Sequence, residues 1–438
     1  MLSREENDLV TRTGSGSPAG DLLRWYWQPT ALTDELPPDR PAKAVRLLGE
    51  DLVLFRDEQG KYGLLGRYCS HRATDLSFGR LEDGGLRCLY HGWLYDVRGR
   101  CLEQPAEPEG SRFHEKIRHK AYPCRELNGI VFAYLGPGDP PDFPDFDCFL
   151  APEEFTFAFK GSLDCNWLQG LEGGIDPCHV SFLHRVFDDE ALADRYGLQF
   201  RDLVSGADVP LTKIVRDHVR PRIEVEETEY GLRIFALRQL DAANMHIRVT
   251  NLLFPNAVSI SLGNDMVITQ WHVPIDDGRS YWYDIFHSFR DPVDKETMRK
   301  QRLELYTLPD YAPRANRSNN YGFDPREQRE LTFTGMGMDV NVHDMWAQES
   351  PGPIHDRTKE HLGYTDKVII AYRSMLLQAI HNVRQGGEPP SVARGSAARR
   401  LRGPVAVDTL GPVDGWEAHW KEHDLARRAQ SKWATNPW

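Results

Sequence analysis

The chain has 438 residues, enough for two or three domains and a sizeable core. Its hydrophobic fraction of 40% is that of an ordinary globular protein, and its net charge of −12 argues against a nucleic-acid partner. The polar, acidic start is unlike a signal peptide, and no apolar run approaches the ~20 residues needed to span a bilayer.

The first 140 residues are predicted to form an arm followed by a small all-β domain. Residues 1–40 are the arm, with a short helix around 20–27. Gly- and Asp-containing turns, including a hairpin turn at 57–60, separate the following runs. The predicted strands are 44–48, 52–55, 62–65 and 129–135. The Pro/Gly-rich segment 136–144 marks a boundary, so we assign residues 41–140 to this domain.

Two short motifs in the β domain each combine one cysteine with one histidine. They are Cys69-x-His71 and, after sixteen residues, Cys88-x-x-His91. Two thiolates and two imidazoles suit a [2Fe–2S] cluster in which the cysteines bind one iron and the histidines the other. A structural zinc site is the alternative, although zinc knuckles usually pair each cysteine with another cysteine.

Residues 141–438 are predicted to form an α+β domain with a C-terminal extension. A helical segment follows Asp164, and alternating runs then predict an antiparallel sheet with one buried face. The runs are 222–227, 232–237, 246–253, 258–262, 266–272 and 281–287. A helix at 364–384 would pack on this sheet. Residues 385–403 are predicted to be a surface loop, and a short helix to begin at Trp416.

The helical segment contains a second metal-ligand pattern, Asp176-x-x-His179-x4-His184. Two neutral imidazoles and one carboxylate on one face of Fe(II) leave positions open for oxygen and substrate. In an ideal helix His179 and His184 would point ~140° apart, so the helix must bend, bulge or end between them. Pro177 is compatible with a helix start. The alternative is two core or solvated histidines on an ordinary helix.

Both motifs, with their surroundings Cys88-Leu-Tyr-His91-Gly-Trp93 and Asn166-Trp-Leu-Gln-Gly-Leu-Glu172, resemble those of Rieske non-haem iron ring-hydroxylating oxygenases. The resemblance extends from the arm to the helix near 380 and is to the phthalate dioxygenase-like branch. It implies an all-β Rieske domain followed by a helix-grip (START-like) catalytic domain. It also implies a [2Fe–2S] cluster, Fe(II), and Asp344 as the third iron ligand, with Glu349 the competing carboxylate.

Further implications concern assembly and electron flow. Relatives form trimers or stacked pairs of trimers, in which the cluster of one subunit lies beside the iron of its neighbour. Asp176 would bridge His91 across that interface to His179. Of the seven cysteines, five lie outside the cluster motifs and give no disulfide framework, so we expect a reducing, cytoplasmic location. Cys178 is assigned a packing role.

The chain shows no fused reductase: Gly14–Gly20 only superficially resembles a dinucleotide loop, because it follows no predicted strand. The expected electron donor is a separate NAD(P)H-dependent reductase with flavin and a [2Fe–2S] cluster. The expected reaction uses O2 to hydroxylate or oxidatively demethylate an aromatic substrate, such as a phthalate-like or benzoate-like carboxylate. Arg248 and Arg220 are the candidate carboxylate anchors, and a solvated position is the alternative for both. The competing functions are a Rieske electron carrier or redox sensor and a zinc-stabilised binding module.

Overall fold

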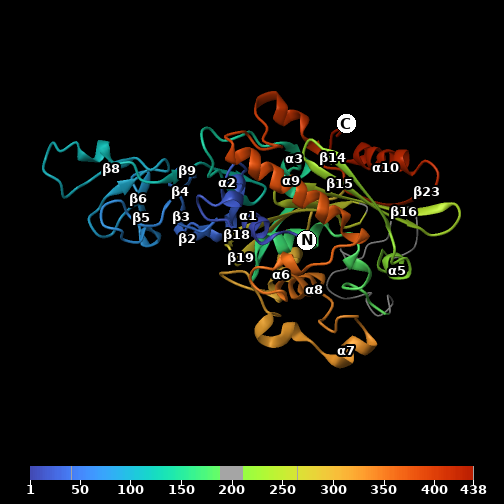
Figure 1. Ribbon diagram of the computed structural model, residues 1–438. Coiled ribbons are helices and arrows are strands. Elements are labelled where there is room, and N and C mark those ends of the chain that lie inside the picture. Colours follow the sequence, from blue (N-terminus) through green and yellow to red (C-terminus); the bar gives the residue numbers. More distant parts are fainter. Residues whose placement is uncertain (41, 188–210, 264, 438) are drawn as a thin grey trace.

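The computed structural model describes the whole chain except residues 41, 188–210, 264 and 438. A small β domain lies at one end and a larger α+β domain at the other (Figure 1). The described helices are α1 (Arg4–Thr11), α2 (Pro18–Leu23), α3 (Asp147–Leu150), α4 (Trp167–Ile175), α5 (Leu211–Asp217), α6 (Lys295–Leu305), α7 (Pro325–Glu330), α8 (Val340–Glu349), α9 (Lys367–Arg384) and α10 (Trp416–Gln430). None of them is long and apolar enough to cross a membrane.

Small antiparallel sheets build the β domain. One has the strand order β2-β3-β4-β9 and another β5-β6-β7-β8. Their bounds are β2 (Ala42–Leu47), β3 (Glu50–Arg56), β4 (Tyr62–Gly66), β5 (Arg80–Glu82), β6 (Gly85–Arg87), β7 (Leu94–Tyr95), β8 (Cys101–Glu103) and β9 (Ala121–Tyr122). The shared core includes Val53, Phe55 and Leu65, and the buried Cys69 and Cys88 join it. The predicted strands and the turn at 57–60 are confirmed.

The N-terminal arm is more structured than predicted. The helix expected around 20–27 is α2, which begins earlier, at Pro18, and ends at Leu23. The sequence interpretation missed α1, whose N-terminus is capped by a capping box of Ser3 and Glu6. It also missed β1 (Gln28–Leu32), which pairs with β11 (Ile130–Ala133). On its other edge β11 pairs with β10 (Cys124–Leu127). The boundaries near residues 40 and 140 stay predictions.

The larger domain is built on one antiparallel sheet. Among the described residues its order is β13-β19-β18-β17-β16-β15-β14, with β23 also paired to β16. The bounds are β13 (Thr156–Leu163), β14 (Arg222–Thr228), β15 (Gly231–Gln239), β16 (Asn244–Leu253), β17 (Ala257–Ser261), β18 (Met266–Asp276), β19 (Arg279–Ser288) and β23 (Val407–Pro412). All predicted runs are strands of this sheet. The minor pairs are β12 (Asp145–Phe146) with β22 (Arg402–Gly403) and β20 (Tyr306–Thr307) with β21 (Ala312–Pro313).

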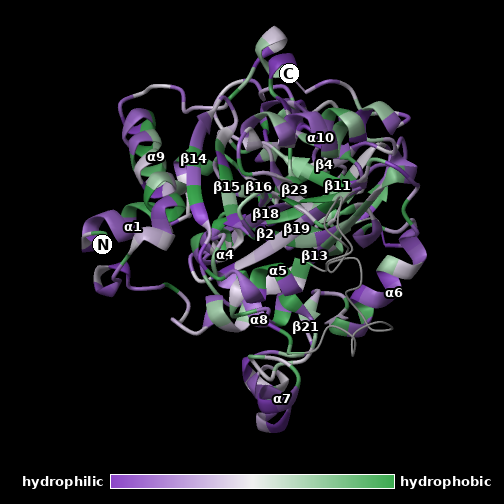
Figure 2. Cartoon of the chain, turned by 90° about the vertical axis from the view of Figure 1, so that its right-hand side faces the viewer, coloured by the Kyte–Doolittle hydropathy of each residue, from purple (hydrophilic) through white to green (hydrophobic). Residues whose placement is uncertain are grey.

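The two faces of the sheet have different partners. On β16, Ile247 and Val249 pack with Trp416 and Trp420 of α10. Because side chains alternate along a strand, Arg248 and Thr250 face the other way, toward a cavity. Helix α4 contacts β16 to β19. Figure 2 shows hydrophobic residues along the inner strands and polar ones on outlying helices such as α1 and α7.

The helix expected at 364–384 is confirmed, because a 3-10 turn at Tyr364–Asp366 leads directly into α9. Residues 385–403 are not simply a loop, because they contain a 3-10 segment at Gly395–Arg400 and the strand β22.

Candidate functional site

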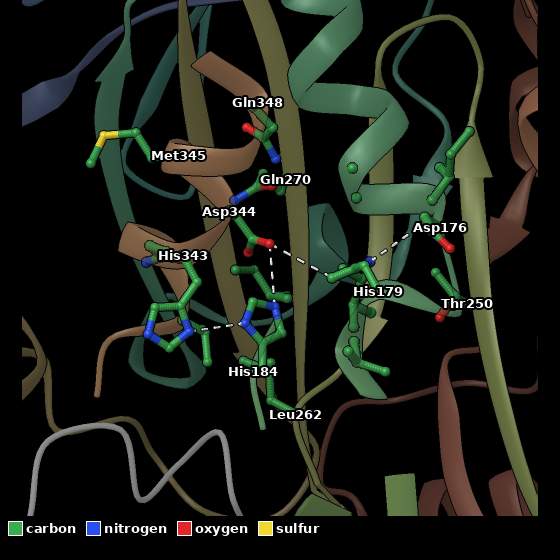
Figure 3. Close-up of a pocket in the computed structure, with 18 of the residues that line it drawn as sticks. Asp176, His179, His184, Thr250, Leu262, Gln270, His343, Asp344, Met345 and Gln348 are labelled. Carbon is green, nitrogen blue, oxygen red and sulfur yellow. Dashed lines mark hydrogen bonds and ion pairs between the residues drawn. The ribbon is translucent and has the colours of Figure 1, made fainter. Parts of the chain in front are cut away.

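Three side chains from distant parts of the chain converge beside the cavity. The Nε2 atoms of His179 and His184 lie 3.6 Å and 3.2 Å from Oδ1 of Asp344. One potential ligand atom from each residue lies within 4.8 Å of the others. In Figure 3 both imidazoles point toward the Asp344 carboxylate. No other described group of three or more His, Cys, Asp or Glu side chains meets this spacing.

His179 and His184 do not lie on one continuous helix, so they need not point in the different directions that an ideal helix would impose. Helix α4 ends at Ile175, and Asp176 is its C-cap residue. A single 3-10 turn, His179–Ser181, follows. Pro177 therefore lies after a helix end and not at a helix start, which corrects the sequence interpretation. Since both histidines lie beyond the helix, the ideal-helix separation does not apply to them.

Asp344 is held by α8, which Asp339 caps at its N-terminus by accepting from the Asn341 N–H. The competing carboxylate, Glu349, is already engaged in hydrogen bonds with other groups. It accepts hydrogen bonds from the Asp164 N–H at 2.9 Å and the Tyr321 hydroxyl at 2.7 Å. Burial raises the pKa of Glu349. The geometry therefore favours Asp344 over Glu349 as a ligand.

Electrostatics at the three side chains suit a cation. Burial lowers the pKa of His179, which favours the neutral imidazole that metals bind. Burial alone would raise the pKa of Asp344, but the imidazoles of His184 and His179 outweigh burial and hold that pKa below its usual value. Two neutral imidazoles and one carboxylate are the donor set of Fe(II) oxygenases.

A buried network of ion pairs holds helix α4 in place. The buried Glu172 accepts from Arg357 Nη2 at 2.7 Å and from Arg373 Nε at 2.6 Å. Arg373 also bonds Glu360. Burial alone would raise the pKa of Glu172, but the two guanidinium groups outweigh it and lower that pKa. The sequence interpretation quoted Glu172 only as part of a motif and missed this role, since Arg357 and Arg373 lie far along the chain.

Asp176 is partly exposed and lies beside His179, a candidate iron ligand. Its Oδ1 accepts from the Cys178 N–H at 2.7 Å, and its Oδ2 lies 3.8 Å from Nδ1 of His179. Its side chain is 24% exposed, so one edge of the carboxylate remains accessible. Nδ1 of His179 has no hydrogen-bond partner among the described residues. Cys178 is partly buried and packs against the core, as expected.

The cavity has a volume of about 210 Å³ and a mostly apolar wall. Its polar lining includes Arg248, Gln270, His272 and Arg302. Arg248 donates to the buried Asp408, which also bonds His246. Arg220 is exposed and is not among the lining residues. Arg302 is a buried lining cation that sequence reasoning missed, because its helix is predominantly polar.

The second site lies in the β domain, between the β4–β5 and β6–β7 connections. Cys69 and Cys88 are each 3% exposed, and the rings of His71 and His91 lie 4.4 Å apart. His71 stacks on Trp93, with ring centroids 4.5 Å apart and planes at 7°. Sγ of Cys69 lies 3.2 Å from the Tyr95 hydroxyl. Two buried thiols beneath two more exposed imidazoles fit a cluster whose two irons differ in environment.

Comparisons with known proteins match both parts of the chain. Residues 26–123 match the Rieske [2Fe–2S] domain, and residues 133–428 match a domain described as LigXa C-terminal domain like. The chain is 36% identical over 402 residues to the phthalate 4,5-dioxygenase oxygenase subunit of Pseudomonas putida, covering 88% of each chain. It is 33% identical over 408 residues to the 5,5'-dehydrodivanillate O-demethylase oxygenase subunit of a Sphingobium species, covering 91% of this chain and 85% of the relative.

The fold has solved counterparts as well. The oxygenase in a reduced oxygenase–ferredoxin complex of carbazole 1,9a-dioxygenase has a TM-score of 0.55 at 20% identity, covering 85% of this chain and 93% of that chain. The chain therefore belongs to the Rieske non-haem iron oxygenases, which are oxidoreductases that carry a [2Fe–2S] cluster and a mononuclear iron. Within that family it falls in the phthalate dioxygenase-like branch.

Proposed function

We propose that this chain is the oxygenase subunit that hydroxylates or O-demethylates an aromatic carboxylate. His179, His184 and Asp344 would bind Fe(II). Cys69, His71, Cys88 and His91 would hold the cluster. The observation that carries the proposal is the convergence of the three iron ligands at the wall of an apolar cavity that also contains a guanidinium group. Bound Fe(II) supplies the oxygen chemistry, and the cavity orients the ring and excludes water.

The charge balance behind the cavity supports an anionic substrate. Arg238 donates to the carbonyls of His218 and Pro177, and its Nη1 is buried without a hydrogen-bond partner among the described residues. Burial and the nearby Arg248 lower the pKa of Arg238 to about 10, so it stays charged at neutral pH. Arg248 forms an ion pair with Asp408, whereas Arg238 interacts with that carboxylate only through space. A substrate carboxylate near Arg248 would offset the excess positive charge.

Transfer between subunits accounts for the placement of the two sites. In Figure 1 β5 and β6, which lie next to the cluster motifs, are at the end of the molecule away from α5. The outer side of His179 borders a hollow of about 790 Å³ lined by Phe182, Phe333 and Trp346. These side chains are exposed, as are Leu89 and Tyr90 beside the cluster motif. We therefore favour a homotrimer, or stacked trimers, in which a neighbour's cluster end docks into this hollow.

Asp176 would then link His91 of one chain to His179 of the next. Its accessible edge and its position beside Nδ1 of His179 support this role. Electrons would come from a separate cytoplasmic NAD(P)H-dependent reductase with flavin and a [2Fe–2S] cluster. The carbazole oxygenase, which has the same fold, is likewise seen in complex with a separate ferredoxin.

The experiment combines metal analysis with product identification. The purified protein should contain about three irons per chain with acid-labile sulfide, whereas two would indicate an electron carrier and zinc a binding module.

With a compatible reductase and NADH or NADPH, mass spectrometry should detect hydroxylated or demethylated products from a panel of aromatic acids. Arg248→Gln should raise KM for those acids by roughly 10–100-fold, because the substrate would lose one charged hydrogen bond. Arg220→Gln, at the exposed arginine, is the matched control.

If aromatic acids give no product while uncharged aromatic analogues do, the substrate class is wrong. Equal KM values for the Arg248→Gln and Arg220→Gln variants would remove Arg248 from the proposal without affecting the iron site.

A further inference from the structure

His343 precedes Asp344 on α8 and is buried against the second histidine of the iron site. Its ring stacks on that of His184, with centroids 5.6 Å apart and planes at 25°. The two Nδ1 atoms are 3.3 Å apart. Nε2 of His343 lies 3.0 Å from the carbonyl oxygen of Gly337. Figure 3 shows the rings facing each other on the side of His184 that is turned away from Asp344.

These contacts assign the protons. A carbonyl oxygen only accepts, so Nε2 of His343 carries the hydrogen that it donates to Gly337. A neutral imidazole has one N–H, so Nδ1 of His343 is an acceptor and Nδ1 of His184 must donate to it. Nε2 of His184 then keeps its lone pair, 3.2 Å from the carboxylate oxygen of Asp344. Two such acceptors side by side suit a cation bound between them, such as a metal ion.

The acceptor at the far end of this chain is itself fixed. The Gly337 N–H donates to Oε1 of Glu327 at 2.8 Å. Gly337 has φ of +78°, in the left-handed region that favours glycine. The turn before α8 therefore directs the Gly337 carbonyl toward His343, and the order Glu327, Gly337, His343, His184 forms a continuous path of hydrogen bonds.

We propose that His343 is a positioning residue that holds His184 in the Nδ1–H tautomer and aims its Nε2 at the iron. Metal-binding histidines usually donate their second N–H to a carboxylate, a backbone carbonyl or water. Here an imidazole takes that place. The proposal rests on the iron site of the proposed function and adds a determinant of metal affinity to it.

The test separates hydrogen bonding from packing. His343→Phe keeps a ring of similar size but has no acceptor, whereas His343→Asn loses the ring volume but places an amide oxygen near the Nδ1 position. Fe(II) affinity is measured by chelator competition on protein that retains its cluster but lacks the mononuclear iron. We expect a loss of about 10–100-fold in His343→Phe and an affinity near wild type in His343→Asn. The visible spectrum of Co(II) at the same site gives a readout independent of turnover.

Controls make each outcome decisive. His287→Phe makes the same replacement at another buried histidine, on β19, and should leave Fe(II) affinity unchanged. An unaltered affinity in His343→Phe, or a weaker one in His343→Asn than in His343→Phe, would overturn the proposal. If His343→Phe does not fold, His343→Ala replaces it, and equal affinities in the Ala and Asn variants would have the same meaning. Unchanged Fe(II) binding in His179→Ala would show instead that the iron site itself is wrong.

Discussion

The two proposed metal sites are built in opposite ways. The cluster residues lie within 69–91, on two turns of one small β domain. Backbone hydrogen bonds within the motifs, such as Cys88 N–H to Trp93 C=O, fix those turns locally. The proposed iron ligands come from the segment that follows α4 and from α8, which strands β14 to β19 separate along the chain. A local site is readable as a motif, whereas an assembled site depends on distant packing.

The same contrast appears in what supports each site. The cluster cysteines rest in a core made by their own domain. Helix α4, which positions the iron loop, depends on Arg357 and Arg373 and on α8. Disturbances far along the chain should therefore reach the iron site and spare the cluster.

The largest expected effect is the loss of one centre at a time. His179→Ala removes an iron ligand and should abolish both turnover and mononuclear iron while the cluster spectrum persists, because the cluster lies in another domain. Cys69→Ser should do the converse. Absorption, electron paramagnetic resonance and iron content measure both. A shared loss of the two signals in either variant would contradict the independence of the two regions.

Asp176 tests whether the two regions meet across a subunit boundary. Asp176→Asn should keep both metals and slow turnover by about 10–100-fold, because the amide cannot accept from two imidazoles as a carboxylate does. Co-assembly of the Cys69→Ser and His179→Ala chains should restore part of the activity, since some interfaces pair an intact cluster with an intact iron. Mixed oligomers that form but remain inactive would point to transfer within one chain.

The same contrast explains which parts of the fold and of the two sites could be predicted from the sequence. Short spacings are enough to propose the four cluster residues, His179 and His184, and these assignments stay predictions. The alternation of 222–287 predicted the sheet correctly. Asp344 needed the family resemblance, since nothing local distinguishes it from Glu349. Its position beside the histidines follows from the packing of α4 on α8. The roles of Glu172, Arg238 and Arg302 could not be predicted, because their partners or cavity are created only by the folded domain.

Glu172 offers a test of remote support. Glu172→Gln leaves two guanidinium groups without their buried counter-charge and should destabilise the catalytic domain by about 3–5 kcal/mol. Because the pKa of Glu172 is lowered on folding, its contribution is present above the unfolded-state pKa and is lost as pH falls through the folded-state pKa. Thermal unfolding followed by circular dichroism should show wild type losing stability on acidification more steeply than the variant. The cluster spectrum at neutral pH should not change, and a bleached cluster would refute the separation of the two regions.

The smallest expected effect is confined to the cluster. The Tyr95 hydroxyl lies 3.2 Å from Sγ of Cys69, and burial raises the pKa of that hydroxyl, so it remains a donor. A hydrogen bond to the thiolate stabilises the more negative, reduced cluster. Tyr95→Phe should therefore lower the reduction potential, by roughly 20–60 mV if the bond contributes a net 0.5–1.5 kcal/mol. Spectroelectrochemical titration measures the shift, with Tyr68→Phe, at an exposed tyrosine next to Cys69, as the control. Fe(II) affinity should be unchanged in both variants, because the contact between Tyr95 and Cys69 lies entirely within the β domain. If Tyr95→Phe has the same reduction potential as wild type, the hydroxyl does not donate to the thiolate.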